Sequence, residues 1–500
     1  MYNNNTKVRA GVSGMSLYVP PLRVPLQAWC EWTGASWSKL GAVVGRSFRM
    51  APSDEDVYTM AASAVLRLLS DYAVDPESVG YLALGTESSR DNSAGAVIVR
   101  GMVDQALKAM GQPGLRRSVE VPEYKHACLG GVYALKGALR FVSCEGRGCK
   151  AIVVASDIAE YARGSSGEPT QGAGAVAMLV DEQARLFRVD LSAGGAASAY
   201  RGPDFRKPLD RHFIDHYSTS ARRYHDFPVF SGKYSTYAYL DQILHAVRDY
   251  WRNNAVRDPV ADLANTRALF FHRPYQNMPV QGLSLIYLAA LAATPRRLAA
   301  VAEPLGFDAD AIYRELKQSP DLFRNIHEFG ADHSPYPLTD ALARAVRKTT
   351  GFKQLAAEKM TLGAEIAMEL GNLYTAALPA WLAAGFEEAL GQEQDLSGAR
   401  LMAVGYGSGD AAEVLAITVS EEWREAAARL HISQALQLSL DLDCPAYQEL
   451  HDERSSPPGY RHNGGFYIDR IGETDSPDFQ DVGVPYYGFS TGATSQGNTD

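Results

Sequence analysis

The chain has 500 residues, of which 46% are hydrophobic and 21% are charged, and its formal net charge is −10. This composition is typical of packed globular proteins, so it excludes general disorder, a collagen-like chain and a coiled coil. The net acidity argues against nucleic acid or an anionic membrane as a partner, because both require a basic surface.

In chain order, short apolar runs alternate with amphipathic stretches of helical spacing. The runs that predict buried strands are 80–85, 150–156, 173–180, 267–271 and 400–405. The stretches that predict helices are 56–72, 94–110, 129–143, 239–252, 282–292, 375–390 and 420–430. This alternation predicts an α/β fold whose strands are buried on both faces.

The two halves of the chain resemble each other in the order of their segments. The strand that ends near 82–89 corresponds to the one that ends near 269–275, and the glycine-then-apolar pattern at 171–180 returns at 405–419. We therefore predict a duplicated α/β unit that packs as one body.

Two segments differ from this pattern. Residues 205–230 are polar and predict a surface loop or short helix, and residues 453–466 predict a loop followed by an edge strand.

The five cysteines are an odd number without a paired framework, which is typical of the reducing cytosol. The chain has no run of about 18 apolar residues and no apolar segment at its start, so we expect a soluble, cytoplasmic protein. Four residues separate Cys144 from Cys149, and without a second cysteine pair or a histidine cluster this spacing is a weak signal for a metal site, so incidental thiols are the favoured interpretation.

Cys128 precedes a run of small and apolar residues, LGGVYALKGAL, that predicts a helix. The unpaired N–H groups at a helix start stabilise a thiolate, so this position favours a nucleophile with a lowered pKa. The alternative is a buried structural cysteine.

Glu87 and His272 each follow a predicted buried strand. Ligands of α/β proteins usually bind where strands end, so we expect both side chains at one edge of the sheet. The alternatives are a core or surface histidine for His272, and a cap of the next helix for Glu87, a role for which Asp91 or Ser93 would compete.

Asn372 and Ser408 are two further candidates. Asn372 precedes a predicted helix, so it either caps that helix or binds a substrate. Ser408 stands in the glycine turn GYGSG, whose backbone N–H groups could bind an oxyanion, although a tight structural turn explains the glycines equally well.

Together, these residues resemble the 3-hydroxy-3-methylglutaryl-CoA synthase family of the thiolase superfamily. The similarity covers about residues 8–420, in a constant order. The motifs that carry it are GVSGMSLYVPPLRV, SFRMAPSDEDVYTMAASA, GTESSRDNSAGAVIV, HAC, EPTQGAGAVAMLV, FHRPY, GNLYT and GYGSG.

The resemblance implies a role for each candidate. Cys128 would accept an acetyl group from acetyl-CoA as a thioester, and Glu87 would remove a proton from its methyl group. The resulting enolate would attack the ketone of an acetoacetyl thioester, polarised by His272 and held in part by Asn372. Backbone N–H groups of Cys128 and Ser408 would form the oxyanion hole, and water would release the product. CoA or phosphopantetheine thioesters are substrates in this scheme, and no cofactor or metal is required.

The resemblance also implies an acyl pocket, and it has departures. Tyr161, Thr170 and Phe205 match positions that line the pocket in the family. Members that act on free CoA usually carry basic residues where this chain has Asn277 and Gln281. The segment 206–230 is longer than usual, and its arginines could supply the missing phosphate contacts: Arg206, Arg211, Arg222 and Arg223.

Three functions compete on this basis. The first is the enzyme of mevalonate-type isoprenoid metabolism, which condenses acetyl-CoA with acetoacetyl-CoA. The second is a polyketide β-branching synthase that acts on β-ketoacyl chains bound to an acyl carrier protein. The third is a catalytically silent acyl-binding partner, which the presence of Glu87, Cys128 and His272 disfavours. A ketoacyl synthase III-like condensation would also use Cys, His and Asn, but it needs no carboxylate at Glu87.

The fold implied by the resemblance is a five-layered αβαβα body built from two related halves, usually a homodimer. We predict a first half at 8–185 with Glu87 and Cys128, and a second half at 186–430 with His272 and Asn372. Residues 431–500 are predicted to be an extension that packs on the second half and ends in disorder.

Overall fold

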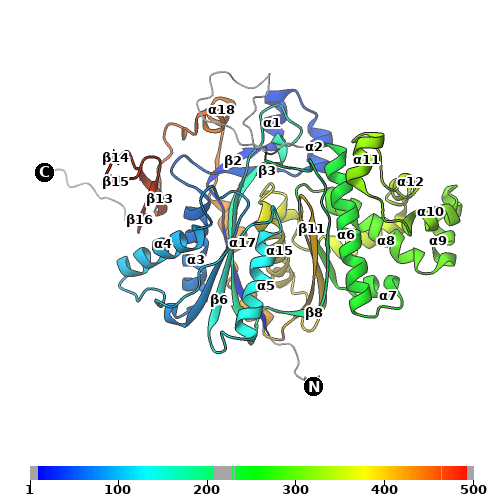
Figure 1. The fold of residues 1–500 in the computed structure, drawn as a ribbon, viewed down its shortest axis with the longest axis horizontal. Coiled ribbons are helices and arrows are strands. Elements are labelled where there is room, and N and C mark those ends of the chain that lie inside the picture. The colour runs from blue at the N-terminus through cyan, green and yellow to red at the C-terminus, as the bar shows by residue number, and fades with distance from the viewer. Residues whose placement is uncertain (1–9, 208–227, 229–230, 463, 492–500) are drawn as a thin grey trace.

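A nine-stranded mixed sheet forms the centre of the molecule, in a computed structural model that describes residues 10–207, 228, 231–462 and 464–491 (Figure 1). The strand order is β5-β4-β6-β7-β1-β8-β11-β10-β9. The bounds are β1 (Gly11–Tyr18), β4 (Val79–Gly85), β5 (Glu123–Tyr124), β6 (Lys150–Ala159), β7 (Gly172–Asp181), β8 (Phe187–Ser198), β9 (Ala268–Phe271), β10 (Arg400–Gly407) and β11 (Ala411–Val419). Most of the residues in these strands are buried, because helices cover both faces.

The sheet has two parts with the same pattern of strands. In the first part β4 and β6 are parallel and β7 is antiparallel to β6; in the second part β9 and β10 are parallel and β11 is antiparallel to β10. The parts meet where β1 pairs with β8 over only two residue pairs, so they diverge beyond this point. The sequence predicted that the strand before Glu87 corresponds to the strand before His272. In the structure these strands are β4 and β9, which occupy equivalent places in the two parts of the sheet.

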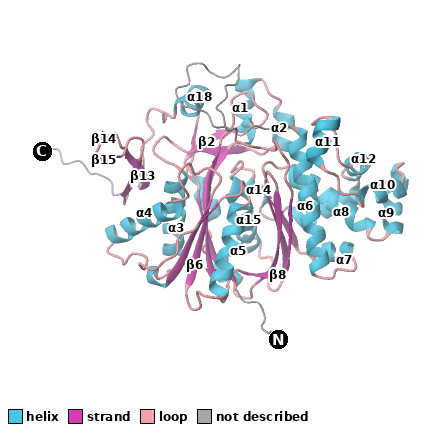
Figure 2. Cartoon of the chain, in the orientation of Figure 1, coloured by secondary structure: helices cyan, strands magenta, loops and turns pink. Residues whose placement is uncertain are grey.

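Helices and strands alternate in layers (Figure 2). Helices α3 (Val57–Asp71) and α4 (Gly95–Ala109) cover one outer face, and α6 (Lys233–Asn253) and α8 (Met278–Ala292) cover the other. Helices α5 (Gly130–Ser143) and α15 (Ala377–Gly391) lie between the two parts of the sheet. Buried apolar side chains of all these elements form the core.

Local signals explain where some helices begin. Asp56 accepts hydrogen bonds from the N–H groups of Tyr58 and Thr59, and the Thr59 hydroxyl accepts one from the Asp56 N–H at 2.8 Å. This capping box fixes the start of α3. Helices α8 and α15 instead are buried around most of their circumference, because neighbouring helices and strands surround them.

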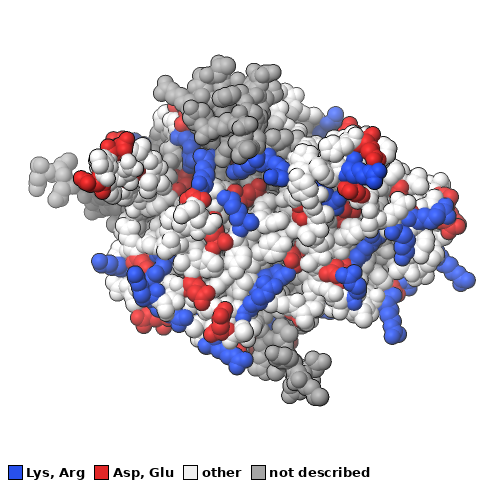
Figure 3. Space-filling model, in the orientation of Figure 1, with Lys and Arg blue, Asp and Glu red and all other residues white. Residues whose placement is uncertain are grey.

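Smaller elements surround this body. Near its top in Figure 1 are α1 (Leu26–Thr33), α2 (Trp37–Val43), β2 (Leu22–Pro25) and β3 (Ser47–Met50). The other helices between α6 and α15 in the chain are α7 (Pro259–Asn265), α9 (Pro295–Ala302), α10 (Ala309–Leu316), α11 (Leu322–Phe329), α12 (Pro337–Val346), α13 (Thr350–Met360) and α14 (Ala364–Ala367). None of the helices in the described ranges combines the length and the apolarity that crossing a membrane requires. Acidic and basic side chains are interspersed on the face shown in Figure 3.

The C-terminal extension packs mainly on the first half, so the prediction that it packs on the second half is wrong. Its elements, with the short helix that precedes it, are α16 (Trp423–Ala427), α17 (Ile432–Gln437), β12 (Leu440–Asp441), α18 (Cys444–Glu453), β13 (Gly465–Ile471), β14 (Asp475–Ser476), β15 (Phe479–Gln480) and β16 (Pro485–Ser490). Within the extension, α17 contacts the second half, where the Ser433 N–H donates to Glu387. However, β12 pairs with β2, and the Tyr487 hydroxyl donates to Asp56 at 2.8 Å. The predicted edge strand is β13, which pairs with β16.

Candidate active site

Cys128 and Glu87 are in direct contact. The Cys128 Sγ donates to Glu87 Oε2 at 3.4 Å, and each residue is only 8% exposed. Glu87 follows β4, and Cys128 stands two residues before α5. Glu87 does not cap α4, whose first N–H groups at Ala94 and Gly95 are bonded by Asp91 and Glu123 instead.

Small residues after Cys128 bring it into the centre of the molecule. A Cβ added to Gly131 would lie 2.8 Å from the carbonyl oxygen of Thr375, so only glycine allows α5 to approach this segment. The backbone before the thiol is tightly turned, since Ala127 has a φ of 41° and the Leu129 N–H donates to the His126 carbonyl at 2.9 Å. The first turn of α5 is therefore wedged between β5 and the GNLYT segment.

Burial controls the electrostatics of this pair. Burial and the neighbouring Asp157 carboxylate raise the pKa of Glu87 to about 7. Burial and the Glu87 carboxylate raise the pKa of Cys128 well above its ordinary value. The predicted position at a helix start is confirmed, but the expected lowering of the thiol pKa is wrong, because desolvation and a like charge outweigh the helix dipole. Cys128 therefore rests as a thiol.

Asp157 is a buried residue that the sequence did not single out. Its Oδ1 accepts hydrogen bonds from the Glu87 N–H at 2.7 Å and from the Ser88 N–H at 3.0 Å, and its Oδ2 accepts from the Thr375 N–H at 2.9 Å. It therefore ties the end of β4 to the segment that follows Asn372. Its place near the end of a predicted strand was the one available signal, and β6 extends to include it.

Asn372 joins an aromatic cluster around the thiol. Tyr161, Tyr374 and Phe205 pack edge to face, with ring centroids 5.9 to 6.3 Å apart, in the same cluster as Cys128. The Asn372 Nδ2 donates to the Tyr161 hydroxyl at 3.3 Å, while its Oδ1 accepts from the Tyr374 N–H at 3.0 Å. Asn372 thus stabilises a short turn, as the capping alternative predicts, and also contacts the aromatic cluster.

His272 lies at the end of β9 beside β10. Its N–H donates to the Val404 carbonyl at 2.7 Å, and its ring stacks on Tyr406. Further along β10, a Cβ added to Gly407 would lie 2.5 Å from the His126 carbonyl, which places the GYGSG turn against the Cys128 segment. Among the described residues, the buried Nδ1 of His272 has no hydrogen-bond partner. Burial lowers the pKa of His272 to about 3, so the ring is neutral.

The remaining residues that the sequence proposed for substrate binding differ in their exposure. The half-buried Thr170 donates its hydroxyl to Gly167 at 2.7 Å, and its carbonyl accepts from the Asn372 N–H at 3.1 Å. Ser408 is half-buried in the turn that follows β10. Arg206 is exposed. The other three predicted phosphate contacts fall outside the described residues: Arg211, Arg222 and Arg223.

Two other features bear on substrates. A cavity of about 940 Å³ lies beside the site, and Ser88 and Tyr374 form part of its wall together with apolar side chains of α4 and the β13–β16 hairpin. Within the described part of the chain, no group of three or more His, Cys, Asp or Glu side chains could hold a metal ion.

Comparison with known proteins gives the family. The family model for the N-terminal part of hydroxymethylglutaryl-coenzyme A synthase matches residues 7–185, and the model for the C-terminal part matches residues 205–449. The hydroxymethylglutaryl-CoA synthase of Haloferax volcanii is 28% identical over 410 residues, 80% of each chain. That of Ganoderma lucidum is 27% identical over 477 residues, 92% of this chain and 88% of the relative.

Solved structures agree with this result. MvaS in complex with 3-hydroxy-3-methylglutaryl coenzyme A superposes with a TM-score of 0.72 at 25% identity, covering 97% of this chain and all of that one. The HMG synthase of the curacin biosynthetic pathway, in complex with a holo donor-ACP, shares the fold with a TM-score of 0.63 at 21% identity, over 89% of this chain and 88% of that one. The chain thus belongs to the hydroxymethylglutaryl-CoA synthase family, has its thiolase-like α/β fold, and is an acyltransferase that catalyses the condensation of that family.

Proposed function

We propose that Cys128 carries the acetyl group and that Glu87 is the base of the condensation. The contact between Sγ and Oε2 at 3.4 Å carries this proposal, because it places a carboxylate beside the atom that would hold the acetyl methyl group. The thiol attacks the acetyl thioester, a new C–S bond forms, and the old C–S bond breaks. The Cys128 proton leaves with the departing CoA or pantetheine thiol.

The second step uses the raised pKa of Glu87. A carboxylate with a pKa of about 7 is a stronger base than an ordinary glutamate, and half of it is ionised at neutral pH. It takes a methyl proton, and the enolate carbon forms a bond to the ketone carbon of the acetoacetyl thioester. His272 is neutral, so one ring N–H donates a hydrogen bond to the ketone oxygen as negative charge develops there.

Other groups hold the acyl chains in this proposal. The backbone N–H groups of Cys128 and Ser408 bind the thioester oxygen, and Asn372 helps to hold the acceptor. Tyr161 and Phe205 enclose the acetyl group, and Thr170 supports Asn372 through its carbonyl. Water then breaks the Cys128 thioester and releases the 3-hydroxy-3-methylglutaryl thioester.

Transfer of labelled acetyl groups tests this function. Acetyl-CoA and an acetyl carrier protein are each incubated with the enzyme, and the label is located by peptide mass spectrometry. We expect acetylated Cys128 with at least one donor, and no label in the Cys128→Ala variant. Absence of label with both donors would refute the proposed function.

A polyketide β-branching synthase is the second candidate function, and two observations favour it. Asn277 and Gln281 are neutral at positions where relatives that use free CoA usually carry a cation, and the first turn of α8 begins there. The 940 Å³ cavity shares Ser88 and Tyr374 with the surroundings of the catalytic pair and is far larger than an acetyl group requires. Comparison of acetoacetyl-CoA, acetoacetyl carrier protein and longer β-ketoacyl acceptors separates the candidates. Strong preference for the carrier and for longer chains would contradict the mevalonate-type function.

We also propose a homodimer, by similarity to the family, and two halves that divide near residue 185. Light scattering on the purified protein measures its mass directly. A monomer at micromolar concentration would contradict this proposal.

A further inference from the structure

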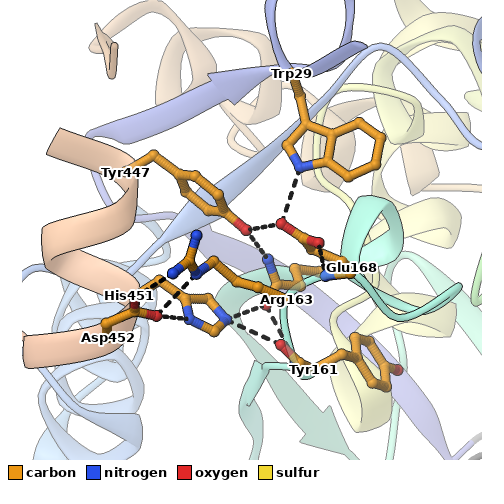
Figure 4. A network of polar contacts seen from close by, with 9 residues as sticks. Trp29, Tyr161, Arg163, Glu168, Tyr447, His451 and Asp452 are labelled. Carbon is orange, nitrogen blue, oxygen red and sulfur yellow. Dashed lines mark hydrogen bonds and ion pairs between the residues drawn. The ribbon is translucent and has the colours of Figure 1, made fainter. Parts of the chain in front are cut away.

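Helix α18 of the C-terminal extension contacts the loop that leads to the acyl pocket. The helix begins at Cys444, where the Asp443 carboxylate accepts from the Ala446 N–H at 2.9 Å. Figure 4 shows Tyr447, His451 and Asp452 of α18 pointing toward Arg163, Glu168 and the backbone of Tyr161. Side chains more than 270 residues apart in sequence therefore form one polar network.

His451 is fully buried at the centre of this network. Its Nε2 lies 2.9 Å from the carbonyl oxygen of Tyr161 and 3.1 Å from Gln171 Oε1. The same Oε1 accepts from the Tyr161 N–H at 3.1 Å, which identifies it as the amide oxygen. Nε2 therefore faces two acceptors and must carry a proton.

The other ring nitrogen also faces an acceptor. Nδ1 lies 3.1 Å from Asp452 Oδ1. Although burial opposes the change, hydrogen bonds from His451 and Arg163 lower the pKa of Asp452 to about 2, so this oxygen belongs to a carboxylate. Both ring nitrogens of His451 therefore face oxygen acceptors, and these contacts fix the ring between α18 and the segment that carries Tyr161 and Gln171.

Further contacts fasten the same loop. Arg163 donates to both carboxylate oxygens of Asp452, from Nε at 2.9 Å and from Nη2. Glu168 accepts from the Tyr447 hydroxyl at 2.6 Å, from Trp29 Nε1 at 3.1 Å, and from the Gly164 N–H. Charge-assisted bonds of this kind are the strong ones, so the loop 161–171 is held to α18 at several points.

The opposite side of this loop forms the acyl pocket. The Tyr161 hydroxyl accepts from Asn372, and its ring packs against Tyr374 and Phe205 in the cluster that contains Cys128. The carbonyl of Gln171 is 3.3 Å from the Asn372 N–H. A shift of the loop would thus move both Tyr161 and Asn372 relative to the thiol.

We propose that His451 is a positioning residue for the condensation, which acts by holding the Tyr161 carbonyl and Gln171 so that Tyr161 and Asn372 keep their places in the acyl pocket. This inference rests on the proposed function, since it assigns the C-terminal extension a part in that reaction. His451 itself does not touch the reacting atoms.

The test compares His451→Ala and His451→Gln with Glu449→Gln, an exposed position on the same helix. We expect the alanine variant to lose condensation kcat by roughly 10- to 100-fold, with KM for the acetyl donor within about twofold, as displacement of a positioned group does. Glutamine places an N–H donor near the position of Nε2 and should restore most of the rate. Equal rates for His451→Ala and Glu449→Gln would overturn the proposal.

A double-mutant cycle with Tyr161→Phe separates positioning from general destabilisation. If His451 acts through Tyr161, the two losses should not add. In the Tyr161→Phe background, which lacks the Tyr161 hydroxyl, His451→Ala should then reduce kcat by no more than about threefold. Thermal stability should fall equally in both backgrounds. Losses of kcat that multiply in full would refute the inference. If His451→Ala does not fold, Asp452→Asn, which changes the acceptor beside Nδ1 of His451, takes its place in the same cycle.

The outcomes also distinguish this inference from the proposed function. A wild-type enzyme that does not acetylate Cys128 contradicts the proposed function. A wild-type enzyme that acetylates Cys128 and condenses, with His451 variants of unchanged kcat, contradicts only the role of His451.

Discussion

Replacement of Glu87 by glutamine should stabilise the protein at neutral and alkaline pH while it abolishes condensation. The carboxyl is buried beside Asp157, and its pKa is raised from 4.5 to about 7 in the folded protein. Between these two values the folded state binds a proton that the unfolded state has lost. Stability is therefore lost as pH rises from about 4.5 to about 7, and the loss is complete above pH 7.

The size of this effect follows from the shift. Each pKa unit corresponds to about 1.4 kcal/mol, so the ionised carboxylate destabilises the fold by about 3 kcal/mol at pH 8 and by about 1 kcal/mol at pH 5. Glutamine cannot ionise. The free energy of unfolding of Glu87→Gln, relative to that of the wild type, should therefore increase by about 2 kcal/mol from pH 5 to pH 8. Any constant difference in packing cancels in this comparison.

Denaturant unfolding at pH 5, 6, 7 and 8 measures the difference. Glu77→Gln, at an exposed position, is the control and should show no such growth. A difference between wild type and Glu87→Gln that stays constant within about 0.5 kcal/mol, or that shrinks as pH rises, would refute the raised pKa and with it the assignment of Glu87 as a base poised near neutrality.

Three further predictions concern neighbouring residues. Condensation kcat should rise with pH, with a midpoint near 7, as Glu87 ionises. Asp157→Asn removes a charge that helps to raise the Glu87 pKa, so this midpoint should move to lower pH. An unchanged or higher midpoint in the pH–rate profile of Asp157→Asn would contradict this. Gly131→Ala should destabilise the fold by roughly 1 to 3 kcal/mol and slow Cys128 acetylation, because the added Cβ would lie 2.8 Å from the Thr375 carbonyl oxygen. A variant as stable as the wild type in denaturant unfolding would contradict the close approach of α5 to Thr375. Asn277→Lys should tighten CoA binding about tenfold in a titration at low salt, as a new charge-assisted contact would, and unchanged affinity would show that CoA phosphates do not reach this position.

The sequence predicted most of the central sheet and helices because their apolar periodicity is strong. The runs at 80–85 and 150–156 are β4 and β6, and the stretch at 129–143 is α5. In contrast, the stretch at 420–430 forms only the short α16, because a turn ends the helix after Ala427. The strands β1 and β8 were not predicted at all, since their glycines and serines weaken the apolar pattern.

The sequence singled out candidate site residues, but it did not predict the contacts between them. Position after a strand was enough to single out Glu87 and His272, whereas Asp157 could be recognised only once the fold showed its six hydrogen bonds to two segments. The thiol pKa could not be predicted, because it depends on burial in the folded core and on a carboxylate 41 residues away in sequence. The placement of the extension on the first half likewise depends on long-range pairs such as Arg163 with Asp452. The division of the chain near residue 185 stays a prediction.

The most direct test of the central claim is the fate of the acetyl group in Glu87→Ala. The enzyme is mixed with labelled acetyl donor and acetoacetyl thioester, and both the protein-bound label and the condensed product are measured. We predict that acetylated Cys128 accumulates and that no 3-hydroxy-3-methylglutaryl thioester forms. Product formation at the wild-type rate would contradict the claim that Glu87 removes the methyl proton.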